Sequence, residues 1–304
     1  MDIGATAFSE QPQIAKRAPR FYVPEKNLQH SQPGATFELG KEETHHALKV
    51  LRLREGAPLE VCDGDGTIAA AFLRGIGHNH RAYVETSQPA TTVPWQGPKW
   101  EIVAACYSLK GGRADFLMEK AAELGAFAVR PILTVRSPYL GRRQIVIEVA
   151  DIDADSEEEL EDIETPDVQR RNRWRRVAQA ATKQCLRAHS LAIRAPLHVS
   201  ELAVRVGKAP LALVGVEGAP GIHQVLQREG AALAKMTQPG SSAGVLLVGP
   251  EGDFTKEELQ GLIEAGAKPV GLGQNRLRVE TAALAMITAV TLGAGPDAMT
   301  SKAL

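Results

Sequence analysis

Two glycine-containing segments in the last third of the chain carry the residues best suited to binding a small molecule. Residues 249–252 (Gly-Pro-Glu-Gly) follow an apolar run and precede a helix start at Thr255, and residues 271–273 form a second segment of the same kind. Open α/β sheets bind ligands beyond the carboxyl ends of their strands, so two such turns on neighbouring strands predict one shared pocket. The alternative is a pair of ordinary strand-to-helix turns.

Neither turn matches a common nucleotide-binding loop. The sequence has no G-x-G-x-x-G dinucleotide fingerprint and no G-x-x-x-x-G-K-[ST] phosphate loop. A catalytic cysteine–histidine signature is also absent from the sequence. The chemistry therefore belongs to a bound cofactor or an activated substrate, which the protein orients and surrounds with charge.

Arg278 and Glu280 flank the start of the last predicted helix, residues 280–292. The helix dipole favours a carboxylate in the first turn, and this alone accounts for Glu280. An arginine at a helix start opposes the dipole. Arg278 therefore needs another reason, such as an anionic or nucleic-acid substrate.

Basic residues gather in two other segments. Lys110 and Arg113 follow the predicted strand 101–107, at the same sheet edge as the glycine turns. Residues 170–187 hold seven bases and no acid. Such a run is either a solvated helix face or, because no acids compensate it, a phosphate-binding surface. Lys120 interrupts an apolar helix face, where a lysine usually snorkels or pairs with a neighbouring glutamate.

Two domains are expected to position these residues, because a chain of 304 residues favours two over one. Residues 20–87 show short strand patterns and one helical piece, residues 41–51, which predicts a small β-barrel. Residues 88–98 are rich in proline and read as a linker. Strands and helices alternate over residues 99–295, which predicts an α/β domain with a mostly parallel sheet and helices on both faces.

Hydrophobic periodicity gives the elements expected in the second domain. The expected strands are residues 101–107, 129–135, 210–216, 245–248 and 268–272. The expected helices are residues 115–124, 170–188, 221–234, a segment from 255 onward, and 280–292. Thr255 and Glu258 have the spacing of a capping box, which satisfies two amides at the helix start.

The composition restricts the class of protein. It is that of a soluble globular chain, with 44% hydrophobic and 23% charged residues and a net charge of -1. No apolar stretch is long enough to span a membrane. Three widely spaced cysteines favour a reducing compartment and argue against disulfides and zinc. The pair His45-His46 has no further ligand at metal-binding spacing, so no metal is expected.

Three segments are expected to lie outside the packed core. Residues 151–167 hold ten acids and no base, which predicts a solvated, disordered insertion. Residues 1–19 and 296–304 are expected to be flexible tails.

Several segments, in order, resemble one family, the small-subunit ribosomal RNA uridine-N3 methyltransferases (the RsmE family) of the SPOUT superfamily. The N-terminal RFYV and HHALKVLRLREG resemble its PUA-like domain. LKGGRADFLMEKAAELGAFAVRPILT and RWRRVAQAATKQCLRAH resemble its lysine-glycine loop and its tryptophan-to-arginine helix. LLVGPEGDFTKEEL and LGQNRLRVETAALA resemble its two cofactor-loop motifs.

The resemblance implies a trefoil-knotted C-terminal domain, S-adenosylmethionine as cofactor, and a homodimer with the site at the subunit interface. It implies ribosomal RNA of the small subunit as partner, in the cytoplasm or, for a eukaryotic chain, in an organelle. The implied cofactor contacts are Val214, Gly215, Gly249, Glu251, Gly252, Leu272, Gly273 and Leu277. Arg278 and Glu280 would be catalytic. The implied RNA contacts are Arg20, His46, Arg52, Lys110, Arg113 and Arg187.

Three features depart from the family pattern. Asp253 stands where the family more often has glycine, Val279 replaces a usual threonine, and the acidic insertion is long. Two alternative functions stay open at this point. One is a SPOUT methyltransferase with another target, such as a 2′-hydroxyl of transfer RNA. The other is a catalytically idle RNA-binding or ribosome-assembly protein.

Overall fold

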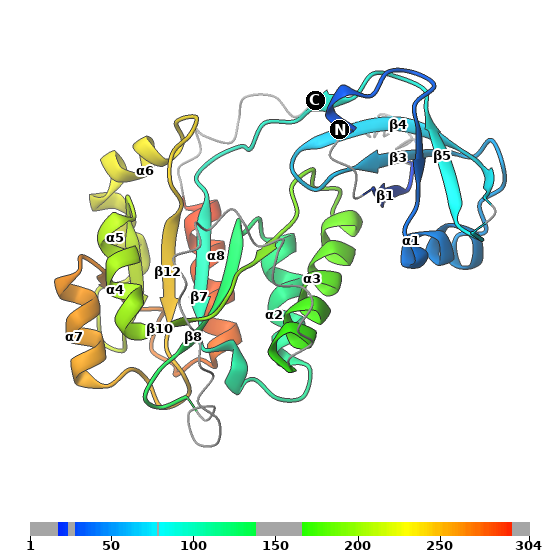
Figure 1. Ribbon diagram of the computed structural model, residues 1–304. Coiled ribbons are helices and arrows are strands. Elements are labelled where there is room, and N and C mark those ends of the chain that lie inside the picture. The colour runs from blue at the N-terminus through cyan, green and yellow to red at the C-terminus, as the bar shows by residue number, and fades with distance from the viewer. Residues whose placement is uncertain (1–17, 24–27, 78, 138–165, 294–304) are drawn as a thin grey trace, which may run out of the picture. The chain divides into compact units, whose positions relative to one another are not determined.

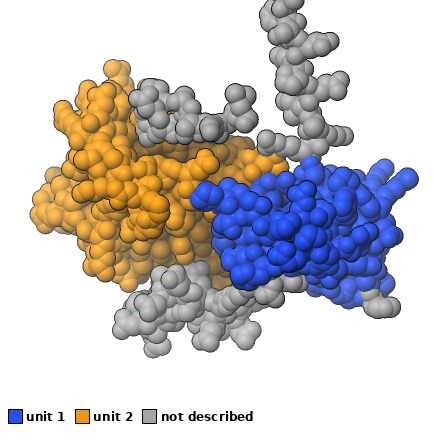
Figure 2. Space-filling model, turned by 90° about the horizontal axis from the view of Figure 1, so that it is seen from above, with its two compact units in different colours: residues 1–94 blue, residues 95–304 orange. Residues whose placement is uncertain are grey.

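The computed structural model describes residues 18–23, 28–77, 79–137 and 166–293. The two expected tails and the acidic insertion fall almost entirely outside these residues. The chain divides into two compact units, residues 1–94 and 95–304, which Figure 2 colours separately. This division falls inside the expected linker, where the short strand β6 (Thr91–Thr92) is also found. Among the described helices, none has the length and apolarity needed to cross a membrane.

The N-terminal unit is built on a β-sheet with the strand order β1-β3-β4-β5-β2, and β6 pairs with β4. Its other strands are β1 (Arg20–Tyr22), β2 (Thr36–Glu38), β3 (Pro58–Cys62), β4 (Thr67–Ile76) and β5 (Ala82–Thr86). The Asp63 carboxylate closes the β3–β4 hairpin by accepting hydrogen bonds from the amides of Asp65 and Thr67, at 2.7 and 2.9 Å. The expected helix 41–51 is α1 (Lys41–His45) continued by a π-helical turn, His46–Val50.

The C-terminal unit contains a parallel sheet with the order β10-β8-β7-β12-β11-β13, and β9 pairs with β8. Its strands are β7 (Trp100–Ala104), β8 (Ala128–Leu133), β9 (Ala192–Ile193), β10 (Leu197–His198), β11 (Ala212–Gly215), β12 (Gly244–Val248) and β13 (Lys268–Val270). Its helices are α2 (Arg113–Glu123), α3 (Pro166–Gln184), α4 (Val199–Lys208), α5 (Ile222–Arg228), α6 (Gly230–Met236), α7 (Lys256–Glu264) and α8 (Val279–Leu292). The predicted α/β class is confirmed.

Helices cover both faces of this sheet. Successive side chains of β12 point to opposite faces, and those of residues 245–248 are all apolar and buried, so both faces must be covered. Leu246 and Val248 point to the core shared with α2, α3 and α8, whereas Val245 and Leu247 point to the core shared with α4 and α7. Figure 1 shows these helices on the two sides of the sheet. A strand that is buried on both faces reads as a continuous apolar run, which is why β12 stands out in the sequence.

The structure differs from the expected elements in three places. The strand expected at 101–107 ends at Ala104 and is followed by a 3-10 turn, Cys106–Ser108. The helix expected at 221–234 is two helices that meet at Gly230, a residue that destabilises helix interiors. The short strands β9 and β10 and the helix α4 were not expected. Leu202 and Val206, four residues apart and buried, were the available signal for α4.

The two glycine turns do not lie on neighbouring strands, which corrects the sequence-based expectation. They follow β12 and β13, and β11 lies between these strands and pairs with both. The end of β11 at Gly215 therefore supplies a third loop to the same edge of the sheet.

Candidate functional site

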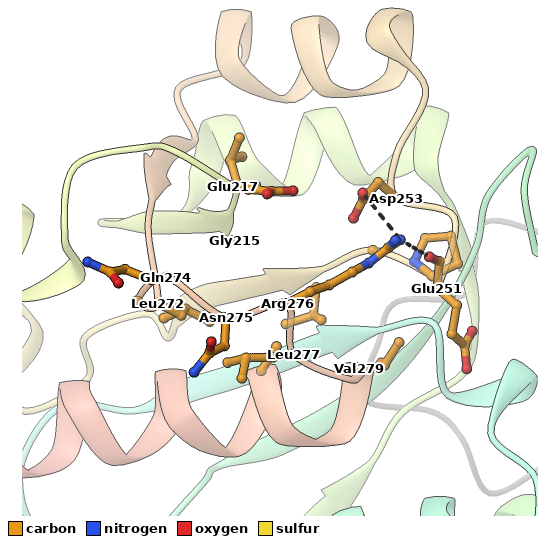
Figure 3. Close-up of a pocket in the computed structure, with 16 residues that line it drawn as sticks. Gly215, Glu217, Glu251, Asp253, Leu272, Gln274, Asn275, Arg276, Leu277 and Val279 are labelled. Carbon is orange, nitrogen blue, oxygen red and sulfur yellow. Dashed lines mark hydrogen bonds and ion pairs between the residues drawn. The ribbon is translucent and has the colours of Figure 1, made fainter.

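A pocket of about 110 Å³ lies at this edge, between the three loops that follow β11, β12 and β13. Figure 3 shows its lining residues on the loops above α8. Among the residues proposed from the sequence as cofactor contacts, the lining includes Gly215, Gly249, Glu251, Leu272, Gly273 and Leu277. Val214 and Gly252 are not among the lining residues. Val214 is fully buried in the sheet core, and Gly252 is exposed.

Close packing between distant segments requires glycine at the start of the second turn. Gly271 donates to the Pro220 carbonyl at 2.8 Å, and its own carbonyl accepts from the Ile222 amide at 3.1 Å. A Cβ atom on Gly271 would lie 2.4 Å from the Ala219 carbonyl oxygen. The turn is thus held against the loop after β11, which fixes two walls of the pocket relative to each other.

The side chain of Arg276 links the second turn to the first. Its guanidinium donates to the Glu251 carbonyl at 2.6 Å and lies 3.9 Å from the Asp253 carboxylate. Figure 3 shows it reaching across the pocket between the two loops. Asp253 has a φ of 58°, a left-handed conformation that glycine adopts without strain. Its side chain is 77% exposed, so it lies at the rim of the pocket.

The pocket lining also includes residues that were not among the cofactor contacts expected from the sequence, although Pro250 belongs to the first turn singled out there and Asp253 directly follows that turn. The additional residues are Val216, Glu217, Val248, Pro250, Asp253, Gln274, Asn275, Arg276, Val279 and Ala282. Their positions in the sequence could have indicated them, because each lies within a few residues of a predicted turn or strand end.

Arg278 and Glu280 differ sharply in their surroundings. Arg278 is the N-cap residue of α8 and is exposed, whereas Glu280 in the first turn is only 6% exposed. The cation that faces Glu280 is Arg113, whose Nη1 lies 3.7 Å from Oε2 of the carboxylate. Among the described residues, no hydrogen bond or ion pair joins Glu280 to Arg278.

Arg113 is the centre of a charged cluster that the sequence did not predict. Its Nη1 also lies 3.6 Å from Oε1 of Glu251, and its Nε donates to the Lys110 carbonyl at 3.1 Å. The second oxygen of Glu251 accepts from the Ser108 hydroxyl at 2.8 Å. The loop after β7 is therefore tied to the rim of the pocket and to α8. Arg113 was expected to bind an RNA phosphate, but it lies between two carboxylates.

The other proposed RNA contacts lie in varied environments. Arg187 donates to the carbonyls of Ala122 and Ala126 at the end of α2. Arg20 is buried and bonds the Glu60 carboxylate at 2.8 and 3.0 Å.

The remaining members of that set lie on or beside exposed turns. Lys110 is exposed, His46 lies in the π-helical turn with its ring 5.8 Å from Phe21, and Arg52 follows with a φ of 52°. Lys120 pairs with Glu119 and Glu123, at 2.7 and 2.8 Å. This is the ordinary role weighed for it from the sequence.

Two buried titratable groups lie in the turn after β7. Burial raises the pKa of the Cys106 thiol to about 12, and it also raises the pKa of the Tyr107 hydroxyl, which donates to Asp167. Both groups therefore stay protonated near neutral pH. In the described part of the chain, no cluster of three or more His, Cys, Asp or Glu side chains has the arrangement of a metal site.

Comparisons with known proteins match two separate segments of the chain. The family model for the RNA methyltransferase domain matches residues 154–291, and the model for the RNA methyltransferase PUA domain matches residues 39–85. The solved structure of the ribosomal RNA small subunit methyltransferase E from Neisseria gonorrhoeae, bound to S-adenosylmethionine, is 26% identical with a TM-score of 0.66. The alignment covers 91% of this chain and 98% of that one.

Two relatives carry the same name. The ribosomal RNA small subunit methyltransferase E of Bacillus subtilis is 25% identical over 278 residues, which cover 90% of this chain and 95% of that protein. The protein of that name from Mycobacterium bovis is 30% identical over 271 residues, 86% of each chain. The sequence, the order of the domains and the fold of this chain all match these relatives. The chain therefore belongs to the ribosomal RNA small subunit methyltransferase E family.

Proposed function

We propose that this chain transfers the methyl group of S-adenosylmethionine to N3 of a uridine in small-subunit ribosomal RNA. The observation that carries the proposal is the pocket at the ends of β11, β12 and β13. It occupies the ligand position expected for an open parallel sheet, in a fold shared with a relative solved with this cofactor.

The pocket residues fit this cofactor, which joins a cationic sulfonium and amino-acid part to an adenosine. The lining carries the acids Glu217, Glu251 and Asp253 against one base, Arg276. This excess of negative charge is complementary to a sulfonium. The apolar lining side chains suit the adenine ring, and they are Val216, Val248, Pro250, Leu272, Leu277, Val279 and Ala282. When bound, S-adenosylmethionine supplies an electrophilic methyl group.

The residues around the pocket have distinct roles in the proposed reaction. N3 of uridine carries a proton and is engaged in base pairing, so the base must leave its stack and lose that proton. Arg278, exposed at the start of α8, stabilises the imide anion that results. Glu280 is assigned as the proton acceptor. Arg113 holds its carboxylate in place.

A methylation assay with product analysis tests the proposal. The full chain is incubated with labelled S-adenosylmethionine and small-subunit RNA that lacks the modification, and the RNA is digested to nucleosides. N3-methyluridine is expected. A 2′-O-methylated product would support the alternative target, and a calorimetric titration without heat of cofactor binding would support an idle RNA-binding protein.

Arg278→Ala tests the assigned catalytic role. Cofactor affinity should stay within about twofold, while kcat falls roughly 10²–10³-fold, the usual loss for a group that stabilises a developing anion. Unchanged turnover would remove Arg278 from the mechanism.

We also propose that the C-terminal unit is a trefoil knot and that the protein works as a homodimer in the cytoplasm. Family membership supports all three statements. Light scattering on the purified chain tests the dimer, which predicts about twice the mass of the monomer of 32.6 kDa.

A further inference from the structure

A second cavity, of about 410 Å³, lies beside the cofactor pocket. It is formed by the turn after β7, the starts of α2 and α3, and the loop between the turn and α2. Its size falls within the range of about 300–1,000 Å³ that is usual for small-molecule sites. The methyl transfer proposed above does not use this cavity, although its lining includes Lys110, an RNA contact implied by the resemblance, and Arg170 and Arg173 of the basic run 170–187.

A guanidinium held over an aromatic pair forms one wall. The rings of Tyr107 and Trp174 stack with centroids 5.6 Å apart and planes at 29°. The guanidinium carbon of Arg170 lies 5.1 Å from the centroid of the Tyr107 ring, within cation–π range. The Tyr107 hydroxyl donates to Asp167, so this ring is fixed at its far end. Arg170 thus presents a planar cation on a rigid support.

The charge of the lining favours an anion. Among the described residues of the lining, the bases Lys110, Arg170 and Arg173 outnumber the one acid, Asp115. Asp115 forms an ion pair with Arg173 and so holds that guanidinium at the cavity. Planar guanidinium groups both stack on nucleic-acid bases and bind phosphate. This combination suits a nucleotide better than an acidic peptide, which offers no ring to stack.

The cavity adjoins the methyl-transfer site through one hydrogen bond. Ser108 is part of its lining and donates at 2.8 Å to Glu251, which lines the cofactor pocket. A nucleotide bound here would therefore be a near neighbour of the base that receives the methyl group.

We propose that this cavity binds one nucleotide of an unpaired RNA strand, with its base on the Arg170 guanidinium and its phosphate at Arg173 and Lys110. The inference rests on the proposed function only in taking RNA as the ligand. A flanking nucleotide held in this way would keep the strand open while its neighbour leaves the stack.

The test measures binding without the methylation reaction. A labelled nine-nucleotide single strand containing uridine is titrated into the full chain in low salt, and fluorescence anisotropy gives Kd. Arg170→Ala should weaken binding about tenfold or more, the scale of one lost stacking contact. Arg173→Ala should weaken it several-fold through one lost phosphate contact. Arg176→Ala is the matched control, since Arg176 lies on the same helix but does not line the cavity, and less than a twofold change is expected.

Two further arms identify the ligand. Uridine 5′-monophosphate should displace the strand at a lower concentration than inorganic phosphate does. Arg170→Lys keeps the positive charge but lacks the planar guanidinium group, so in this variant the two anions should displace the strand at equal concentrations. Equal losses in the Arg170, Arg173 and Arg176 variants would overturn the proposal, as would equal displacement by the two anions. Because Arg173 is 65% exposed, its variant should fold even if Arg170→Ala does not.

The nucleotide site and the proposed function can fail independently of each other. If the wild-type chain methylates RNA but the Arg170 and Arg173 variants bind the strand and turn over normally, only the nucleotide site fails. If the wild-type chain yields no methylated product but the variants lose strand affinity as expected, the nucleotide site stands and the proposed reaction fails.

Discussion

At the scale of single residues, Arg113 is the residue whose interpretation changes most between the sequence and the structure. Its guanidinium lies between Glu251 and Glu280, and its side chain is 28% exposed. Glu280 is nearly buried, so Arg113 shields its carboxylate from an uncompensated burial that an exposed carboxylate would not face. In the proposed reaction, Arg113 is therefore assigned as a positioning residue that acts through Glu280 and the pocket rim.

Arg113→Ala should lower kcat by about tenfold or more, because it removes the cation that holds Glu280. KM for RNA should change by less than about threefold, and Arg113→Lys should recover part of the loss. Steady-state kinetics with varied RNA concentration provide the measurement. A rise in KM with unchanged kcat would restore the phosphate-binding role expected from the sequence.

Asp253 offers a second test at this scale, since its left-handed backbone disfavours most side chains. Asp253→Ala should be less stable than Asp253→Gly by about 1 kcal/mol, because only glycine avoids the contact between Cβ and carbonyl oxygen. Urea denaturation of both variants measures the difference in free energy of unfolding. Equal stabilities would mean that the loop relaxes around residue 253.

At the scale of elements, helix starts determine where the loops of the pocket end. Thr255 accepts from the Glu258 amide at 3.2 Å, and Glu258 accepts from the Thr255 amide at 2.8 Å, which confirms the predicted capping box. Glu258 also accepts from the amide of Val135 at 2.9 Å, so the box joins α7 to the segment after β8.

Thr255→Ala should destabilise the protein by about 1 kcal/mol, the usual loss for an N-cap hydroxyl. Thr255→Ser keeps the hydroxyl and is the control, expected within a few tenths of a kcal/mol of the wild type. Thermal or urea unfolding compares the three proteins. If the two variants lose stability equally, the methyl group of Thr255 matters rather than its cap.

At the scale of the whole molecule, the contact between the loop after β11 and the turn after β13 decides whether the pocket exists. The segments are far apart in the sequence, and two main-chain hydrogen bonds, which together form one parallel β-bridge between Gly221 and Gly271, join them. The space between them has no room for a side chain at Gly271.

Gly271→Ala should therefore destabilise the protein by more than about 2 kcal/mol and weaken cofactor binding, because a backbone carbonyl must move. Gly261→Ala is the matched control. Gly261 lies within α7 with open space around its Cβ position, so alanine there should be neutral or stabilise by up to about 1 kcal/mol. Calorimetry with S-adenosylmethionine and urea unfolding give both quantities. A Gly271→Ala variant with normal stability and affinity would contradict this account.

The sequence by itself determined the α/β class, most strands and helices, and the two glycine turns, because each depends on burial along one element or on local backbone freedom. It also determined the capping box and the family. The structure alone decided which elements meet. Strand order put β11 between the two turns, and the loop after β7 brought Arg113 between Glu251 and Glu280. Arg113 lies more than a hundred positions from both glutamates, and β11 pairs with strands that follow it only after intervening helices, so no local periodicity encodes these contacts.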